Sequence, residues 1–328
     1  MYGRVRCTSH IVYRFCFSAY GNWTAKCFMT GFRLLFKFIY GVEKMKKNII
    51  CKVSLFFLIA LTVSIVIPGC TEKEEETETV ITTSPLPESE LLRTEDSGDF
   101  VFAVYEDYVE VTGYSGTSET VTVPELYDNT RVMSIGKSAF EGNSSVKYVV
   151  LSSSIVNIDT SAFSRCKNLE SIDMPGVRSI SPSAFKDSGL RSVELPSVLE
   201  NLGRYSFSGT SLEIITLPGS IVRSGEYVFS GCTSLKSVTF DEGFPEISSR
   251  MFSGCTALTE VVISKGIKTI GDYAFAYCTG LKKVIVPSET AVKDGAFYGI
   301  SNLTICSGSG SSAESYSKKY NVTFETVS

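Results

Sequence analysis

The stretch I-G-K-S-A-F at residues 135–140 decides the fold, because its pattern returns along the chain at a nearly constant interval. The pattern ends in a phenylalanine eight times, at spacings of 22 or 23 residues: Phe140, Phe163, Phe185, Phe207, Phe229, Phe252, Phe275 and Phe297. A fixed period of this length is typical of solenoids, in which each repeat folds as one coil and buries its apolar side against the next. We therefore expect these phenylalanines to stack in one internal column as the structural core.

Each repeat has a second part, L-x-x-V-x-L-P, as at residues 190–196. Its alternating apolar residues predict a short strand, which the proline ends because it lacks an N–H group for the next ladder bond. In I-G-x-x-A-F-x-x-C the apolar residues lie three to five apart, which predicts a short helical or 3₁₀ turn. Neighbouring coils should align their strands in a parallel sheet.

The two motifs together resemble the BspA-like (Treponema pallidum type) leucine-rich repeat, over about residues 100–327. The resemblance implies a leucine-rich-repeat solenoid of about eight coils. It also implies adhesion to host or matrix proteins, or to other cells. The repeats proper span residues 135–306.

The two ends of the solenoid need caps, because a stack exposes its core there. Residues 99–134 should form an N-terminal β cap and a degenerate first coil, with a hairpin turn at Glu106-Asp107 and an insertion near residues 125–130. Residues 307–328 should form a C-terminal cap, with a short helix over residues 312–320 followed by a strand.

The N-terminal part has the layout of a lipoprotein precursor. Residues 45–69 combine lysines, a fifteen-residue apolar run and the sequence Ile67-Pro68-Gly69 before Cys70, which is the order of a signal peptide. The cysteine resembles a bacterial lipobox, which implies a lipid anchor on Cys70; the alternative is a transmembrane helix that starts near Val53. Residues 1–44 are interpreted as a mis-annotated or unstructured extension, with a real amphipathic extension as the alternative.

Residues 70–98 are acidic and poor in apolar groups, so we expect a disordered tether. The acidic run after the lipid cysteine also resembles an export signal of surface lipoproteins. Together these features predict a cell-envelope protein that is lipid-anchored on the outer surface.

Charge and composition exclude several functions. Residues 1–52 hold ten of the 31 basic side chains and one of the 35 acids, which leaves 21 basic and 34 acidic residues in the remainder. An acidic rod binds polyanions poorly, so nucleic acid is not an expected partner. The sole histidine, His10, lies outside the repeats, and no hydrolase, metalloprotease or P-loop motif occurs. We therefore predict no catalytic residue, no metal and no cofactor.

The cysteines Cys232, Cys255 and Cys278 each lie three residues after a phenylalanine, so they should form a ladder on successive coils. Their expected separation permits disulfides. Because other repeats place small polar residues at this position, we favour free thiols packed in a small inward slot.

The outward strand positions form the candidate binding face, and they are Tyr148, Val150, Asp173, Glu194, Thr216, Thr239, Val262 and Ile285. Asp173 and Glu194 should lie on neighbouring coils, either as two solvated carboxylates or as a site for a cation or a basic partner. We predict a surface-anchored protein-binding or adhesion module, whose partner is an extracellular, host or matrix protein or another cell surface. The alternatives are a glycan-handling accessory module and a self-associating structural protein.

Overall fold

The computed structural model describes residues 85–327, which belong to one compact unit, Val80–Ser328. The predictions for residues 1–44, for the signal segment 45–69 and for the lipid anchor at Cys70 lie outside the described residues, as does the first half of the tether. Within residues 85–327, no helix is long and apolar enough to cross a membrane.

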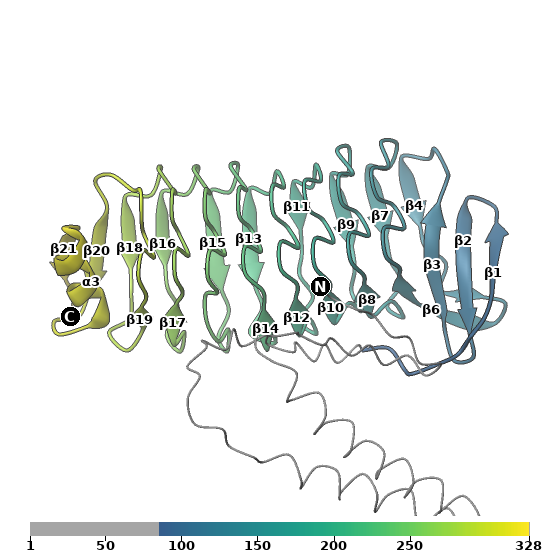
Figure 1. Ribbon diagram of the computed structural model, residues 1–328, viewed down its shortest axis with the longest axis horizontal. Helices are drawn as coiled ribbons and strands as arrows, with labels where there is room; N and C mark the ends of the chain where they lie inside the picture. The colour runs from purple at the N-terminus through teal and green to yellow at the C-terminus, as the bar shows by residue number, and fades with distance from the viewer. Residues whose placement is uncertain (1–84, 328) are drawn as a thin grey trace, which may run out of the picture. The chain divides into compact units, whose positions relative to one another are not determined.

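The described residues form a parallel β-solenoid of about nine turns (Figure 1). The V-x-L segments form the strand face of this solenoid, with Val149 beside Ile172 and Val261 beside Val284 in register. This face consists of β4 (Thr120–Thr122), β7 (Tyr148–Val150), β9 (Ser171–Asp173), β11 (Ser192–Val193), β13 (Ile214–Leu217), β15 (Ser237–Phe240), β16 (Glu260–Val262), β18 (Lys283–Ile285) and β20 (Thr304–Ser307).

A second set of parallel strands precedes the turns, where sequence analysis expected none. It consists of β6 (Thr130–Ile135), β8 (Asn157–Ile158), β10 (Ser179–Ile180), β12 (Asn201–Leu202), β14 (Arg223–Ser224), β17 (Thr269–Ile270) and β19 (Ala291–Val292). Buried backbone groups need hydrogen-bond partners, and in a coil without helices the adjacent coil supplies them. Each coil therefore contributes up to two short strands.

The phenylalanine segments are successive turns, so the prediction of helical or 3₁₀ turns was wrong. In each of them, the residues two before and two after the phenylalanine have positive φ, as Ser161 (59°) and Arg165 (60°) do around Phe163. A left-handed residue interrupts a helical run, because the hydrogen-bond ladder of a right-handed helix cannot continue through it. The Phe163 N–H instead donates to the Ala184 carbonyl of the next coil, at 2.7 Å.

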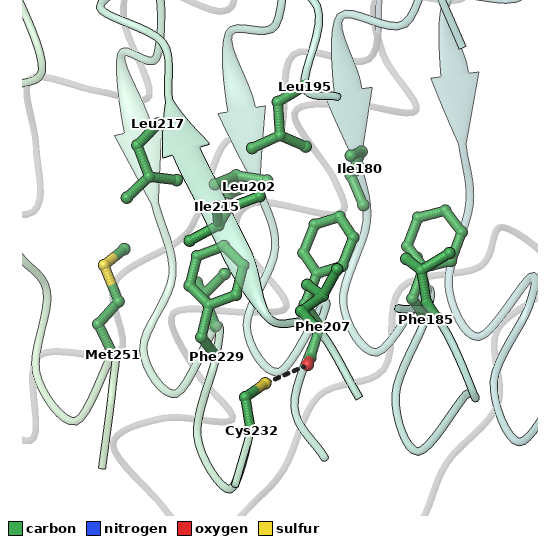
Figure 2. Close-up of a cluster of buried hydrophobic side chains, with 14 of the residues drawn as sticks. Ile180, Phe185, Leu195, Leu202, Phe207, Ile215, Leu217, Phe229, Cys232 and Met251 are labelled. Atoms are coloured by element: carbon green, nitrogen blue, oxygen red, sulfur yellow. Dashed lines mark hydrogen bonds between the residues drawn. The ribbon is translucent and has the colours of Figure 1, made fainter. Parts of the chain in front are cut away.

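The predicted column of aromatic rings is present. Consecutive rings from Phe140 to Phe297 lie 4.8 to 5.6 Å apart and are nearly parallel. Figure 2 shows Phe185, Phe207 and Phe229 in this arrangement, with aliphatic side chains packed around them. Each of the eight side chains is at most 3% exposed. The column is therefore the centre of the hydrophobic core.

The N-terminal end begins with an antiparallel sheet of β1 (Leu91–Ser97), β2 (Phe100–Tyr105) and β3 (Val109–Tyr114). The prediction that the disordered tether extends to residue 98 was wrong, because Leu91–Ser97 forms strand β1. This polar segment pairs with the edge of β2 through backbone hydrogen bonds, which do not depend on apolar side chains. The insertion near residue 125 is a hairpin of β5 (Leu126–Tyr127) and β6, turned by Asp128 and Asn129 with positive φ. The Tyr114 ring stacks on Phe140 at 5.0 Å and so extends the aromatic column.

The C-terminal end carries helix α3 (Ser312–Tyr320) and strand β21 (Thr323–Thr326), which pairs with β20. The last coil has N–H groups that would otherwise donate to a following coil. Three side chains of α3 accept them: Ser312 Oγ from Val292 (2.9 Å), Tyr316 Oη from Phe297 (3.0 Å) and Tyr320 Oη from Gly295 (3.2 Å). Helix α3 thus supplies the hydrogen-bond acceptors that a following coil would otherwise provide.

Candidate functional site

The predicted binding positions lie on the strand face and point outward. Tyr148 is 41% exposed, Val150 39% and Val262 53%, whereas Ile285 is half-buried. The exposed polar residues between these two apolar ends are Asp173, Glu194, Thr216 and Thr239. The structure therefore separates the apolar residues into two groups and forms no continuous apolar patch along this column.

The acidic pair on this face does not extend into a larger cluster. Among residues 85–327, no group of three or more histidine, cysteine or acidic side chains could hold a metal ion. Asp173 and Glu194 remain two exposed carboxylates on neighbouring coils.

The cysteine side chains of the repeats pack between neighbouring coils. The described cysteines are all free, and the repeat cysteines are buried. The Cys232 Sγ donates to the Phe207 carbonyl of the preceding coil at 3.1 Å (Figure 2), and Cys255 donates to the Phe229 carbonyl at 3.2 Å. Burial raises the pKa of Cys166 to about 12, so its reactive thiolate form is suppressed at neutral pH.

A second surface, which sequence analysis missed, lies on the turns. The turn position two residues before each phenylalanine has φ between 56° and 63° in all eight repeats. Its occupants change along the chain, and they are Ser138, Ser161, Ser183, Tyr205, Tyr227, Arg250, Tyr273 and Gly295. Bulky side chains rarely adopt this left-handed conformation, and such outliers often mark functional sites. We call Tyr205, Tyr227, Arg250 and Tyr273 the tyrosine–arginine ridge.

The ridge is held together by stacking of rings and cations. The Tyr205 and Tyr227 rings lie 4.6 Å apart. The Arg204 guanidinium lies 5.0 Å from the Tyr205 ring centre, and the Arg250 guanidinium lies 5.4 Å from Tyr227 and 4.9 Å from Tyr273. Arg250 also donates to the Tyr227 hydroxyl, and this hydrogen bond raises the pKa of Arg250. The ridge therefore presents ordered aromatic and cationic groups.

An open groove of about 530 Å³ is lined in part by three residues of the ridge, Tyr227, Arg250 and Tyr273. Its lining residues, which we call the tyrosine groove, are Tyr227, Arg250, Ser253, Tyr273, Ala276, Tyr277 and Tyr298. Tyr277 is 54% exposed and Tyr298 51%, and the Tyr298 ring stands nearly perpendicular to both Tyr273 (73°) and Tyr277 (88°). These edge-to-face contacts leave part of each tyrosine ring exposed in the lining of the groove.

Sequence analysis compared the apolar positions of the repeats and the outward strand positions, but not the variable turn positions. A comparison of the turn positions would have shown a change from serine to tyrosine or arginine at Tyr205. Sequence reasoning could not show the groove, because packing between four successive repeats sets the ring orientations that shape it.

The chemistry of the tyrosine groove is that of a binding surface. Tyrosine and arginine dominate the energetics of protein interfaces, and tyrosine beside serine and glycine is typical of antibody paratopes. The lining supplies no nucleophile activated by a neighbouring base.

Comparison with known proteins agrees with the geometry. The family model for the BspA type leucine rich repeat region matches residues 118–212 and 200–314, with six copies. The crystal structure of a leucine rich repeat protein of T. pallidum, TpLRR, is similar to 58% of this chain and 91% of that chain, at 28% identity and a TM-score of 0.53. A leucine-rich repeat protein from Bacteroides ovatus shares the fold at 22% identity and a TM-score of 0.51, over 72% of this chain and 66% of that one. No curated protein matches the sequence.

Leucine-rich repeats of this type generally mediate protein–protein interactions. The family match extends from residue 118 to residue 314, which is more than half of the 328 residues. Because the repeat pattern, the solenoid fold and the family match agree, the chain belongs to the BspA-type leucine-rich repeat family.

Proposed function

We propose that this chain is a lipid-anchored adhesion module on the outer cell surface, and that it binds an extracellular protein through the tyrosine groove. The family suggests protein binding in general. The observation that carries the proposal is the groove itself: exposed tyrosines and a stacked arginine surround small residues on a rigid β-solenoid. Such a surface binds at low entropic cost, because tyrosine has few rotatable bonds and the backbone beneath it is fixed by the coils.

The anchor is proposed from sequence. The apolar run and Ile67-Pro68-Gly69-Cys70 favour cleavage before Cys70 and acylation of its thiol. Two or more acyl chains hold a protein stably on a membrane, whereas one does not. We expect the wild type to incorporate a labelled fatty acid in cells that produce it, and Cys70→Ser to abolish this incorporation. No incorporation into the wild type, or equal incorporation into the variant, would exclude a lipid anchor on Cys70.

Binding is tested with the purified full chain in detergent, against immobilised extracellular-matrix proteins and, in parallel, a glycan array. The test variant combines Tyr273→Ser and Tyr298→Ser in the groove. The matched control combines Tyr148→Ser and Val262→Ser, which removes comparably exposed side chains from the strand face. We expect saturable protein binding that the groove variant loses and the control keeps.

Three results would redirect the proposal. Loss of binding only in the control variant would move the site to the strand face. Glycan binding without protein binding would favour a glycan-handling module. Concentration-dependent assembly with no binding of either kind would favour a self-associating structural protein.

A further inference from the structure

We infer that the tyrosine groove receives an extended, proline-rich segment of the partner protein in the polyproline II conformation. This inference rests on the proposed function and deepens it, because it names the chemical class that the groove recognises. Three features of the described residues carry it: the arrangement of the rings, the hydrogen-bonding character of the lining and the rigidity of the backbone.

The arrangement of the rings suits proline. Tyr273 and Tyr277 belong to the same coil and flank Ala276, while Tyr298 comes from the next coil. Because Tyr298 contacts both other rings edge-to-face, with ring centres 6.1 Å from Tyr273 and 5.6 Å from Tyr277, the three rings present aromatic surface in more than one orientation. Proline-rich ligands dock into aromatic-lined grooves of this kind, where proline rings pack against the exposed faces of the aromatic side chains.

The polar groups of the lining match the backbone of such a ligand. A polyproline II segment has no internal hydrogen bonds, so its carbonyl groups are free acceptors, and proline offers no N–H donor. The lining supplies donors: the Arg250 guanidinium, which only donates, and the hydroxyls of Ser253 and the tyrosines. None of the lining residues carries a carboxylate or a carboxamide. A neutral glycan, whose hydroxyls both donate and accept, would find donors in the lining but only hydroxyl oxygens as side-chain acceptors.

The groove is also pre-organised. Tyr273 and Tyr277 have left-handed backbones with φ of 56° and 60°. Their N–H groups donate to the backbone carbonyl oxygens of Asp294 (3.3 Å) and Tyr298 (2.7 Å) of the next coil, so the coil stack fixes the backbone that carries the rings. A polyproline II segment is rigid before binding as well, so neither partner loses much conformational freedom.

The test uses the full chain in detergent and a fluorescently labelled ten-residue polyproline peptide, with binding followed by fluorescence anisotropy. The control peptide has ten alternating glycine and serine residues. We expect saturable binding of polyproline, and binding of the control that is weaker by about tenfold or more, which corresponds to about 1.4 kcal/mol. We expect Tyr298→Ser and Tyr277→Gly each to weaken polyproline binding about fivefold or more, as loss of an interface anchor does.

The matched control variant is Val222→Ser, which removes an exposed apolar side chain outside both the groove and the strand face and should leave affinity unchanged within about twofold. Circular dichroism melting of every variant shows whether the fold is intact. Equal affinity for the two peptides, or equal affinity of Tyr298→Ser and the wild type, would overturn the inference. If the matrix protein still binds while polyproline does not, the proposed function survives and only the ligand class is wrong. If groove variants bind both ligands like the wild type, both proposals fail.

Discussion

Tyr277 allows a test that separates a side chain retained for binding from one retained for stability. It occupies the turn position two residues after its phenylalanine, with φ of 60°. At this position, five other repeats carry glycine with φ of 69° to 78°: Gly142, Gly209, Gly231, Gly254 and Gly299. Glycine adopts this conformation freely, whereas any residue with a Cβ atom is destabilised there by roughly 1–2 kcal/mol.

The perturbation is the pair of substitutions Tyr277→Gly and Tyr277→Ala. Both remove the ring and its edge-to-face contact with Tyr298, so that loss cancels between them. Glycine relieves the left-handed strain but adds roughly 0.5–1 kcal/mol of unfolded-state entropy. We therefore expect Tyr277→Gly to be more stable than Tyr277→Ala by about 0.5–1 kcal/mol.

Tyr298 is the matched control for this pair. It lines the same groove and is similarly exposed, but it is not among the residues with positive φ. At Tyr298, glycine brings only its entropic cost, so Tyr298→Gly should be less stable than Tyr298→Ala by roughly 0.5–1 kcal/mol. The order of the two variants should reverse between the two positions.

Urea unfolding followed by circular dichroism measures these differences as shifts of the midpoint at equal slope. Midpoints are the appropriate quantity, because repeat arrays can depart from two-state unfolding. The reasoning is refuted if alanine equals or exceeds glycine at Tyr277, or if both positions show the same order. Confirmation would mean that the backbone at residue 277 favours glycine over a residue with a Cβ atom. A Tyr277→Gly midpoint at or above that of the wild type would then identify the tyrosine as a residue retained for contact.

Three further predictions concern the core and the ends. Phe207→Ala should lower the free energy of unfolding by about 3–5 kcal/mol, because it leaves a cavity in the aromatic column, and a loss below about 1 kcal/mol in urea unfolding would contradict the packing. Tyr316→Phe should cost about 1–3 kcal/mol, since the Phe297 N–H loses its acceptor while the ring remains; unchanged melting would mean that α3 does not satisfy the last coil. Burial raises the pKa of the Glu110 carboxyl above its ordinary value of 4.5. Ionisation of Glu110 therefore destabilises the folded state as the pH rises above about 4.5. Glu110→Gln should therefore be more stable than the wild type at pH 7, with an advantage that disappears near pH 4, and a pH-independent difference would argue against this origin.

The sequence by itself determined the repeat architecture. The recurrence of phenylalanine every 22 or 23 residues placed Phe140 to Phe297 in one column, and period-two alternation located the strand-face strands. The hairpin at Glu106-Asp107 and the helix at residues 312–320 could also be predicted from the sequence. These features depend on local periodicity and turn chemistry, which act within a few residues of the chain.

Only the tertiary structure decided the turns and the candidate site. The phenylalanine segments avoid a helix because alternate N–H groups donate to the next coil, as Phe163 does to Ala184, and the apolar spacing within a segment does not show which carbonyl group each N–H will meet. The same holds for β1, whose polar sequence is ordered by the edge of β2. The contact between Tyr227 and Arg250 exists because coil stacking makes residues a full repeat apart into neighbours, and the surface that they build is therefore a property of the stack.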